Sequence, residues 1–161
     1  MYSFTYYELG DHHAAEDATE RTFLSALANL HAFEERARPA DGDGASTFKV
    51  WLFQIARNAI ANERRSARRN PATTLDDVSA AIIADPLNVE EDALRRDEAA
   101  AAWRAVGRLP GDRRRALVLR FVNEMSTAEI AGVMERSEGA VRVLIHRGLR
   151  SVARELGRRD R

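Results

Sequence analysis

Apolar residues recur at three- and four-residue spacing along most of the chain, and strict alternation of apolar and polar residues is nearly absent. The first kind of spacing places apolar side chains on one face of an α-helix, whereas alternation would indicate a strand. The pattern therefore predicts an all-α protein. We expect the first helix to begin at Ala14, and the predicted helices cover residues 14–31, 48–69, 90–108, 111–123, 127–134 and 138–156.

The apolar residues predict which face of each helix is buried. In the helix over residues 14–31 the inward face is expected to hold Ala18, Phe23, Ala26, Leu27 and Leu30. In the helix over residues 48–69 it is expected to hold Trp51, Leu52, Ile55, Ala59 and Ile60. In the last helix it is expected to hold Val141, Leu144, Ile145, Leu149, Val152 and Leu156. Trp51 at this spacing is expected in the core rather than as an exposed platform for nucleic-acid bases.

Two segments lack the helical pattern. Residues 34–47 hold Pro39, Gly42 and Gly44 among charged residues, which predicts a mobile loop. Residues 70–89 place acidic and small residues between Pro71 and Pro86, a composition typical of a linker between domains. We therefore expect two small helical domains, at residues 1–70 and 90–161, joined by a flexible linker at residues 71–89.

Charge is unevenly distributed, although the 25 basic and 25 acidic residues cancel. Net charge is −6 over residues 1–47, +5 over 48–70, −6 over 71–99 and +7 over 100–161. Two separate anion-binding surfaces would need such a distribution, because distant charges are screened within about 10 Å. The absence of cysteine excludes disulfides and thiolate metal sites. No run of about 18 apolar residues and no signal peptide is present, so we expect a soluble cytoplasmic protein without membrane insertion.

Residues 126–147 have the pattern of a helix-turn-helix. Ser126 and Glu129 form a predicted capping box at the start of the first helix, and Ser137 is the predicted N-cap of the second. Glu135 stands in the turn, where a positive φ would cost a non-glycine residue about 1 kcal/mol. The turn is therefore mildly strained or differently shaped. The pattern further depends on apolar or small residues at Ile130, Ala131, Met134, Val141 and Leu144.

The second helix of this unit can read DNA. Such a helix fits the major groove, where its first two turns reach base edges. The side chains expected to point outward from it are those of Glu138, Arg142, His146 and Arg147. A plain helical hairpin with a solvated arginine face is the alternative that the motif alone leaves open.

Four motifs follow one another along the chain, beginning with residues 15–23 (AEDATERTF) and 51–58 (WLFQIARN) and continuing through residues 109–121 to the helix-turn-helix. In this order they resemble the motifs of the extracytoplasmic-function, or sigma-24-like, RNA polymerase sigma factors. The first two resemble regions 2.2 and 2.3 of that family. Residues 109–121 (LPGDRRRALVLRF) resemble the start of region 4, and its helix-turn-helix is similar to residues 125–131 (MSTAEIA) and 137–142 (SEGAVR). Only fourteen residues precede Ala15, so the resemblance also implies a truncated region 2.1.

The resemblance implies a promoter-recognition protein with no catalytic activity and no cofactor. Its implied partners are core RNA polymerase, through the beta-prime clamp helices and the beta flap, and promoter DNA, with an anti-sigma factor as a further candidate. Region 2 would bind the minus-ten element and region 4 the minus-thirty-five element. The implied polymerase-binding residues are Asp17, Glu20 and Phe23.

Candidate contacts to the minus-ten strand follow from side-chain chemistry. Asparagine can form paired hydrogen bonds to adenine, and arginine supplies phosphate contacts. The candidates on the helix over residues 48–69 are Arg57, Asn58, Arg65 and Arg68.

Two other classes of protein compete with this interpretation. One is a stand-alone helix-turn-helix regulator that never binds polymerase, which the motif at residues 51–58 argues against. The other is a small metal-dependent hydrolase that uses His12, His13 and Glu16, because His and carboxylate four residues apart share one helical face.

Overall fold

The computed structural model describes residues 1–33, 46–69 and 93–158, and the regular structure in these ranges is helical throughout. The all-α prediction is therefore confirmed. The elements are α1 (Tyr2–Leu9), α2 (His12–Asn29), the 3-10 helix η1 (Leu30–Ala32), α3 (Thr47–Arg69), α4 (Ala93–Gly107), α5 (Gly111–Phe121), α6 (Thr127–Met134) and α7 (Glu138–Leu156). Six of these helices match the predicted ranges closely.

Helix α1 was not expected from the sequence. Its residues Phe4, Tyr6 and Tyr7 are buried, but so are Thr5 and Glu8, so no polar face contrasts with an apolar one. A helix that is buried on all sides gives no amphipathic pattern. Gly10, with φ 75°, ends the helix and donates its N–H to the Tyr6 carbonyl at 2.8 Å.

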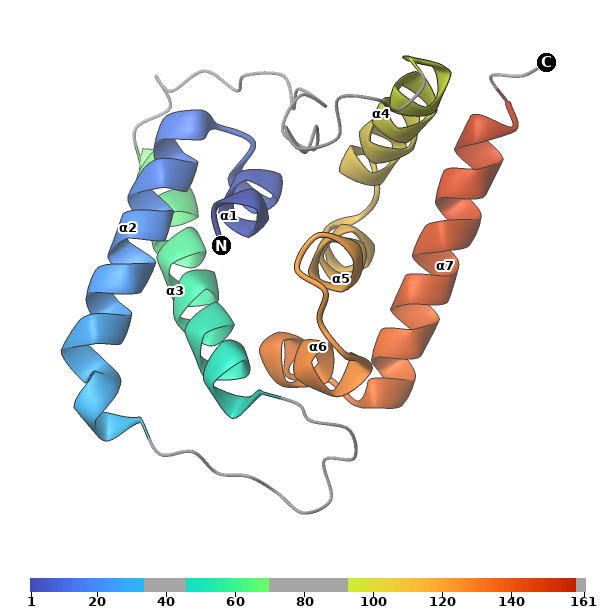
Figure 1. Cartoon of the computed structure of the whole chain (residues 1–161). Helices are drawn as coiled ribbons and strands as arrows, with labels where there is room; N and C mark the ends of the chain where they lie inside the picture. Colours follow the sequence, from blue (N-terminus) through green and yellow to red (C-terminus); the bar gives the residue numbers. More distant parts are fainter. Residues whose placement is uncertain (34–45, 70–92, 159–161) are drawn as a thin grey trace.

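One hydrophobic core is shared by helices α1 and α3 of the N-terminal half and helices α4–α7 of the C-terminal half. Figure 1 shows these two groups side by side, with α1 facing α5 and the start of α3 beside α6. Phe4 packs on Phe53 with ring centroids 5.2 Å apart, and Tyr7 lies 5.6 Å from Trp103 of α4. Leu117 and Ile130 are buried in the same cluster. The two halves of the chain are thus joined in this structure by apolar packing.

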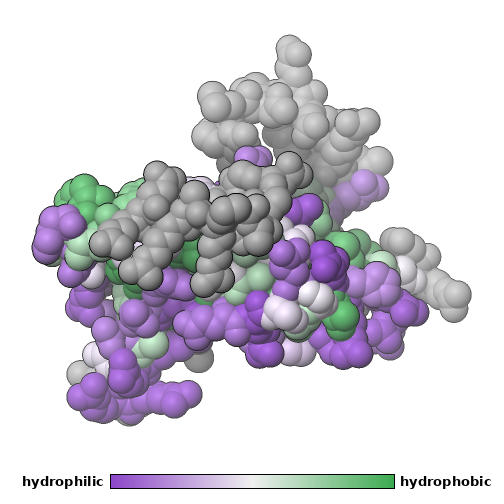
Figure 2. Space-filling view, turned by 90° about the horizontal axis from the view of Figure 1, so that it is seen from below, coloured by the Kyte–Doolittle hydropathy of each residue, from purple (hydrophilic) through white to green (hydrophobic). Residues whose placement is uncertain are grey.

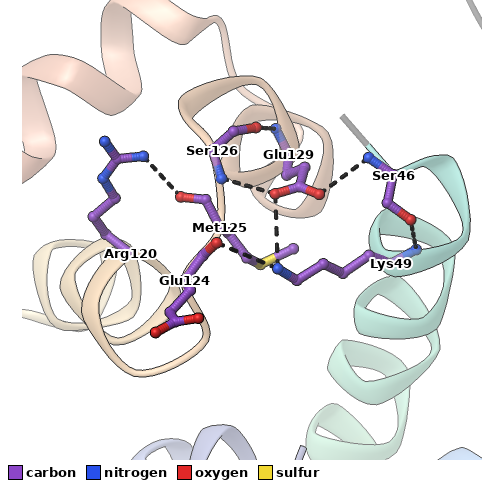
Figure 3. Close-up of polar contacts among 7 residues, drawn as sticks. All are labelled: Ser46, Lys49, Arg120, Glu124, Met125, Ser126 and Glu129. Atoms are coloured by element: carbon purple, nitrogen blue, oxygen red, sulfur yellow. Dashed lines mark hydrogen bonds and ion pairs between the residues drawn. The ribbon is translucent and has the colours of Figure 1, made fainter. Parts of the chain in front are cut away.

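A polar network joins the halves at a second place, where the loop before α6 meets the start of α3 (Figure 3). Glu129 accepts hydrogen bonds from the backbone N–H of Ser46 at 3.0 Å and of Ser126 at 2.7 Å. Lys49 lies 3.8 Å from the same carboxylate and donates to the Glu124 carbonyl at 3.4 Å. The buried carboxylate of Glu129 therefore caps α6 and binds the first turn of α3 at once.

Close backbone approach accompanies this network. Gly132 of α6 lies against Val50 of α3, and a Cβ at Gly132 would stand 2.8 Å from Val50 Cγ1. The Gly132 carbonyl accepts a hydrogen bond from Gln54 Nε2 at 3.0 Å. Glycine at this position lets the two helices approach each other.

Several leucines and one phenylalanine that the pattern assigned to the core are exposed. Helix α2 buries a line of small residues instead, Ala15, Ala18, Thr22 and Ala26, which allows it to lie close to α1 and α3. The larger residues fall beside this line on the helix surface. The inward placement was wrong for Phe23 and Leu27 of α2, for Leu30 of η1 and for Leu149 of α7.

Most of the predicted loop and all of the predicted linker, residues 34–45 and 71–89, lie outside the described residues. The division into separable domains at residues 1–70 and 90–161 stays a prediction. Among the helices described, none combines the length and the apolar character needed to cross a membrane.

Candidate nucleic-acid interface

The helix-turn-helix is formed by α6, the turn at residues 135–137 and α7. Ser126 Oγ accepts from the Glu129 N–H at 3.1 Å and completes the predicted capping box. Ser137 Oγ accepts from the Ala140 N–H at 3.2 Å and caps α7, as predicted. Glu135 has φ 53°, in the left-handed region that disfavours side chains, so the strained form of the turn is the one that occurs.

The predicted DNA-reading face of α7 is exposed to solvent. Val141 is buried and Leu144 packs against the core, which turns the opposite face of the helix outward. That outward face carries Glu138, Arg142, His146 and Arg147, all exposed. Arg142 Nη1 lies 3.3 Å from Glu138 Oε2, so the two side chains form an ion pair along the helix.

Helix α3 presents three of its four predicted DNA contacts to solvent. Asn58, Arg65 and Arg68 are exposed. Arg57 is different, because its Nη1 donates to the Val133 carbonyl at 2.6 Å and lies 3.4 Å from Glu135 Oε1. In this arrangement Arg57 binds the helix-turn-helix of its own chain, a contact that the sequence did not indicate.

An aromatic group lies at the start of α3. The ring centroid of Trp51 is 5.0 Å from that of Phe33 and 5.6 Å from that of Phe48. Trp51 is half-buried and Phe48 is exposed. The core placement predicted for Trp51 is therefore only half correct, and Phe33, which belongs to the same group, was missed.

The predicted polymerase-binding residues lie on the outer surface of α2. Asp17, Glu20 and Phe23 are all exposed. The same outer surface, with η1, exposes further leucines, of which Leu27 is the most accessible at 69%. Figure 2 shows green, apolar residues at the left edge of the molecule, the side on which α2 lies in Figure 1. Contiguous apolar surface of this kind marks interaction sites. Leu24, which is 57% exposed, was not among the residues predicted for this surface.

Of the three residues in the alternative hydrolase interpretation, His13 and Glu16 lie near each other, whereas His12 contacts Tyr2. His12 Nδ1 lies 2.6 Å from the Tyr2 hydroxyl, and His13 Nδ1 lies 3.8 Å from Glu16 Oε2. Within the described ranges no three His, Asp or Glu side chains gather closely enough to hold a metal ion.

A buried carboxylate joins α1, α3 and α5. The Glu8 side chain is 3% exposed, and both of its oxygens accept hydrogen bonds from Arg115, at 2.8 and 2.7 Å. Arg64 Nη2 lies 2.6 Å from one of these oxygens and also donates to the Glu8 backbone carbonyl. Burial alone would raise the pKa of Glu8, but the hydrogen bonds and charge of Arg115, with the charges of Arg64 and Arg114, hold that pKa below its ordinary value.

This triad was missed by the sequence analysis. Its members lie 56 and 107 positions apart along the chain, and no local pattern relates them. Only the folded arrangement brings them together.

Comparison with known families gives two matches in chain order. Residues 1–70 match the family described as Sigma-70 region 2, and residues 99–152 match the family described as Sigma-70, region 4. These ranges contain the exposed surface of α2, the arginines of α3 and the helix-turn-helix.

Two curated relatives align over most of the chain. It is 35% identical over 157 residues to the ECF RNA polymerase sigma factor BldN of Streptomyces coelicolor, with 97% of this chain covered. The chain spans 56% of the length of BldN. It is 33% identical to the ECF RNA polymerase sigma factor SigL of Mycobacterium tuberculosis, and the alignment covers 92% of this chain and 79% of SigL.

The fold is also similar to a solved structure. The sigma factor RpoE of Bartonella quintana, crystallised with the anti-sigma factor NepR, superposes with a TM-score of 0.69. The match covers 97% of this chain and 89% of RpoE at 20% identity. Because the sequence identity is low, this likeness shows a shared fold.

Proposed function

Because the chain belongs to the extracytoplasmic-function family of RNA polymerase sigma factors, we propose that it binds core RNA polymerase and directs it to promoters. The observation that carries the proposal is the exposed basic face of α7 within a fully capped helix-turn-helix. Transcription takes place in the bacterial cytoplasm, and we propose that the chain acts there.

Core polymerase is proposed to bind the outer surface of α2. Phe23 with the exposed leucines supplies apolar area, and Asp17 and Glu20 supply charge. A combination of exposed apolar surface and flanking charge is typical of a protein interface. The proposed docking sites on the polymerase are the beta-prime clamp helices for this surface and the beta flap for the C-terminal half.

Promoter DNA is proposed to bind at two places. The face of α7 with Arg142 and Arg147 would read the minus-thirty-five element from the major groove. Asn58, Arg65 and Arg68 of α3 would contact the minus-ten strand. Arg57 could join them only after its hydrogen bond to the Val133 carbonyl is broken.

An anti-sigma factor is proposed as a further partner. The support for it is that RpoE, which shares this fold, was crystallised with one.

The decisive experiment is transcription in vitro with purified core polymerase, with and without the chain, followed by mapping of the start sites. We expect specific transcripts only when the chain is present. The double variant Phe23→Ala, Leu27→Ala on α2 should no longer be retained by immobilised core polymerase. The control variant Arg150→Ala, at an exposed position of α7, should be retained as well as the parent chain.

The same experiment separates the competing class of protein. A stand-alone regulator would bind promoter DNA but would neither be retained by core polymerase nor produce new start sites, and that result would disprove the proposal.

A further inference from the structure

A cavity of about 300 Å³ opens between α3 and α5 beside the buried Glu8. Arginines dominate its lining, with Ile60 and Ala61 as the remaining members. Four of these arginines come from α3 and one from α5: Arg57, Arg64, Arg65, Arg68 and Arg115. The cavity is therefore formed by both halves of the chain.

Positive charge exceeds negative charge at this cavity. Among the described residues, no carboxylate belongs to the lining. Glu8 lies beside it, and its two oxygens already accept hydrogen bonds from Arg115 and Arg64. Glu135 pairs with Arg57, but it lies largely in solvent. Five guanidinium groups thus line one space, and three carboxylates act on members of this group: Glu8, Glu135 and Asp112.

The surplus charge has a cost within the fold. Burial lowers the pKa of the neighbouring Arg114, and the charges of Arg64 and Arg115 lower it further against the opposing effect of Glu8. Arg114 Nε is buried and has no hydrogen-bond partner among the described residues. Like charges held together in this way are stabilised by a bound counter-ion.

Several donors remain for such an ion. Arg64 uses only its Nη2 in hydrogen bonds to the described residues, so its Nε and Nη1 have no acceptor there. Arginine presents its donors in a planar fork that matches phosphate oxygens. The cavity is at the lower end of the range for ligand pockets, about 300 to 1,000 Å³, so a phosphate chain fits it better than a whole nucleotide would.

We propose that the α3–α5 cavity binds a small polyphosphate anion, which bridges the arginines of the two halves of the chain. Bound there, the anion would stabilise the packing of α3 on α5 and would occupy Arg65 and Arg68, which α3 otherwise offers to DNA. The binding itself does not depend on promoter recognition. It can therefore be tested whether or not the proposed function holds.

The test is calorimetric titration of the full chain with inorganic tripolyphosphate at constant ionic strength. We expect one anion per chain and an increase in thermal midpoint on binding. Arg65→Ala with Arg68→Ala should weaken binding by about tenfold or more for each arginine. The matched control, Arg150→Ala with Arg154→Ala on α7, removes the same charge elsewhere and should change affinity less than twofold.

Nuclear magnetic resonance of arginine Nε groups tests whether both halves take part. Tripolyphosphate should shift the signals of Arg64 and Arg115 and leave that of Arg154 in place. Equal weakening by the two variant pairs would mean unspecific attraction and would overturn the proposal. A parallel titration with single-stranded DNA tests the other source of phosphate, the DNA backbone. Suppose that the variant lacking Arg65 and Arg68 loses DNA binding and that tripolyphosphate does not bind the parent chain. The two arginines then bind the DNA backbone, and the anion site is disproved.

Discussion

Among single residues, Arg142 is the one whose position on α7 best suits base readout. It is exposed one turn into the helix, opposite the buried Val141. We expect Arg142→Ala to weaken promoter binding by about 1 to 3 kcal/mol and to relax the preference at one base pair, because a bidentate contact to a base would be lost. Binding to matched and single-substituted duplexes measures both effects, and an unchanged affinity and preference would remove α7 from the recognition role.

Arg147 lies further along α7, where phosphates are nearer than base edges. Its replacement by alanine should weaken binding to all sequences alike and reduce the slope of log affinity against log salt by about one unit. A salt series on the same duplexes gives this slope. Retention by core polymerase should be largely intact, since the proposed contact with the beta-prime clamp helices, at Asp17 and Glu20 of α2, is unchanged.

Glu8 should control stability in acid. Its pKa in the folded protein is below the ordinary value, so its ionised form contributes stability above about pH 4.3 and loses that contribution as the pH falls toward the folded pKa. Glu8→Gln should lower the free energy of unfolding at neutral pH by about 3 to 5 kcal/mol, because Arg115 and Arg64 lose their partner.

The same variant should flatten the dependence of stability on pH below about pH 4.3. Denaturant unfolding across this range measures the effect. The exposed Glu98→Gln on α4 is the control and should follow the parent protein. If Glu8→Gln kept the parent slope in acid, the assignment of this ionisation would be wrong.

Between elements, the closest approach is that of α6 to α3 at Gly132. Gly132→Ala would place a methyl group 2.8 Å from Val50 Cγ1. We expect it to destabilise the protein by about 1 to 3 kcal/mol despite the better helix propensity of alanine. Thermal or denaturant unfolding gives the value, and Val50→Ala in the same chain should restore part of the loss.

A second glycine provides the control for the Gly132→Ala variant. Gly139 lies in the first turn of α7, and a Cβ there would meet nothing closer than 3.9 Å. Gly139→Ala should therefore be neutral or stabilising by up to about 1 kcal/mol. Equal destabilisation by both variants would mean that contact between α3 and α6 is not the cause.

In the whole molecule, the packing of the two halves conflicts with simultaneous binding of both promoter elements. The minus-ten and minus-thirty-five positions differ by about 25 base pairs, or about 85 Å at ~3.4 Å per base pair. In this structure α3 and α6 are in van der Waals contact. We therefore expect the halves to separate when promoter and core polymerase bind.

Fluorescence energy transfer between dyes attached to two introduced cysteines measures this separation. The chain has no cysteine of its own, so Ala67→Cys on α3 and Ala153→Cys on α7, both at exposed positions, can be labelled selectively. Transfer should be efficient in the free chain and fall in the complex with core polymerase and a promoter duplex. A duplex with only the minus-thirty-five element serves as the control for DNA binding alone. Unchanged transfer in the full complex would contradict the expected opening.

The helices and their ends could be predicted from the sequence wherever the signals are local. Apolar spacing predicted α2 to α7 because each of these helices has one face toward the core and one toward solvent. Ser126, Glu129 and Ser137 fixed the starts of α6 and α7, since a cap needs only residues within one turn. The outward face of α7 followed from the same short-range periodicity. The order of the motifs was visible in the sequence through its resemblance to the sigma-factor family.

The features that depend on contacts between distant segments of the chain became visible only in the folded protein. Helix α1 is buried on all sides, so apolar and polar residues do not alternate along it with a helical period. Phe23 and Leu27 are exposed because the small residues of α2, not its large ones, pack against α1 and α3. The pairing of Arg57 with the helix-turn-helix and the arginine-lined cavity beside Glu8 join groups from both halves of the chain. Electrostatic and packing interactions act through space, and no pattern of neighbours along the chain encodes them.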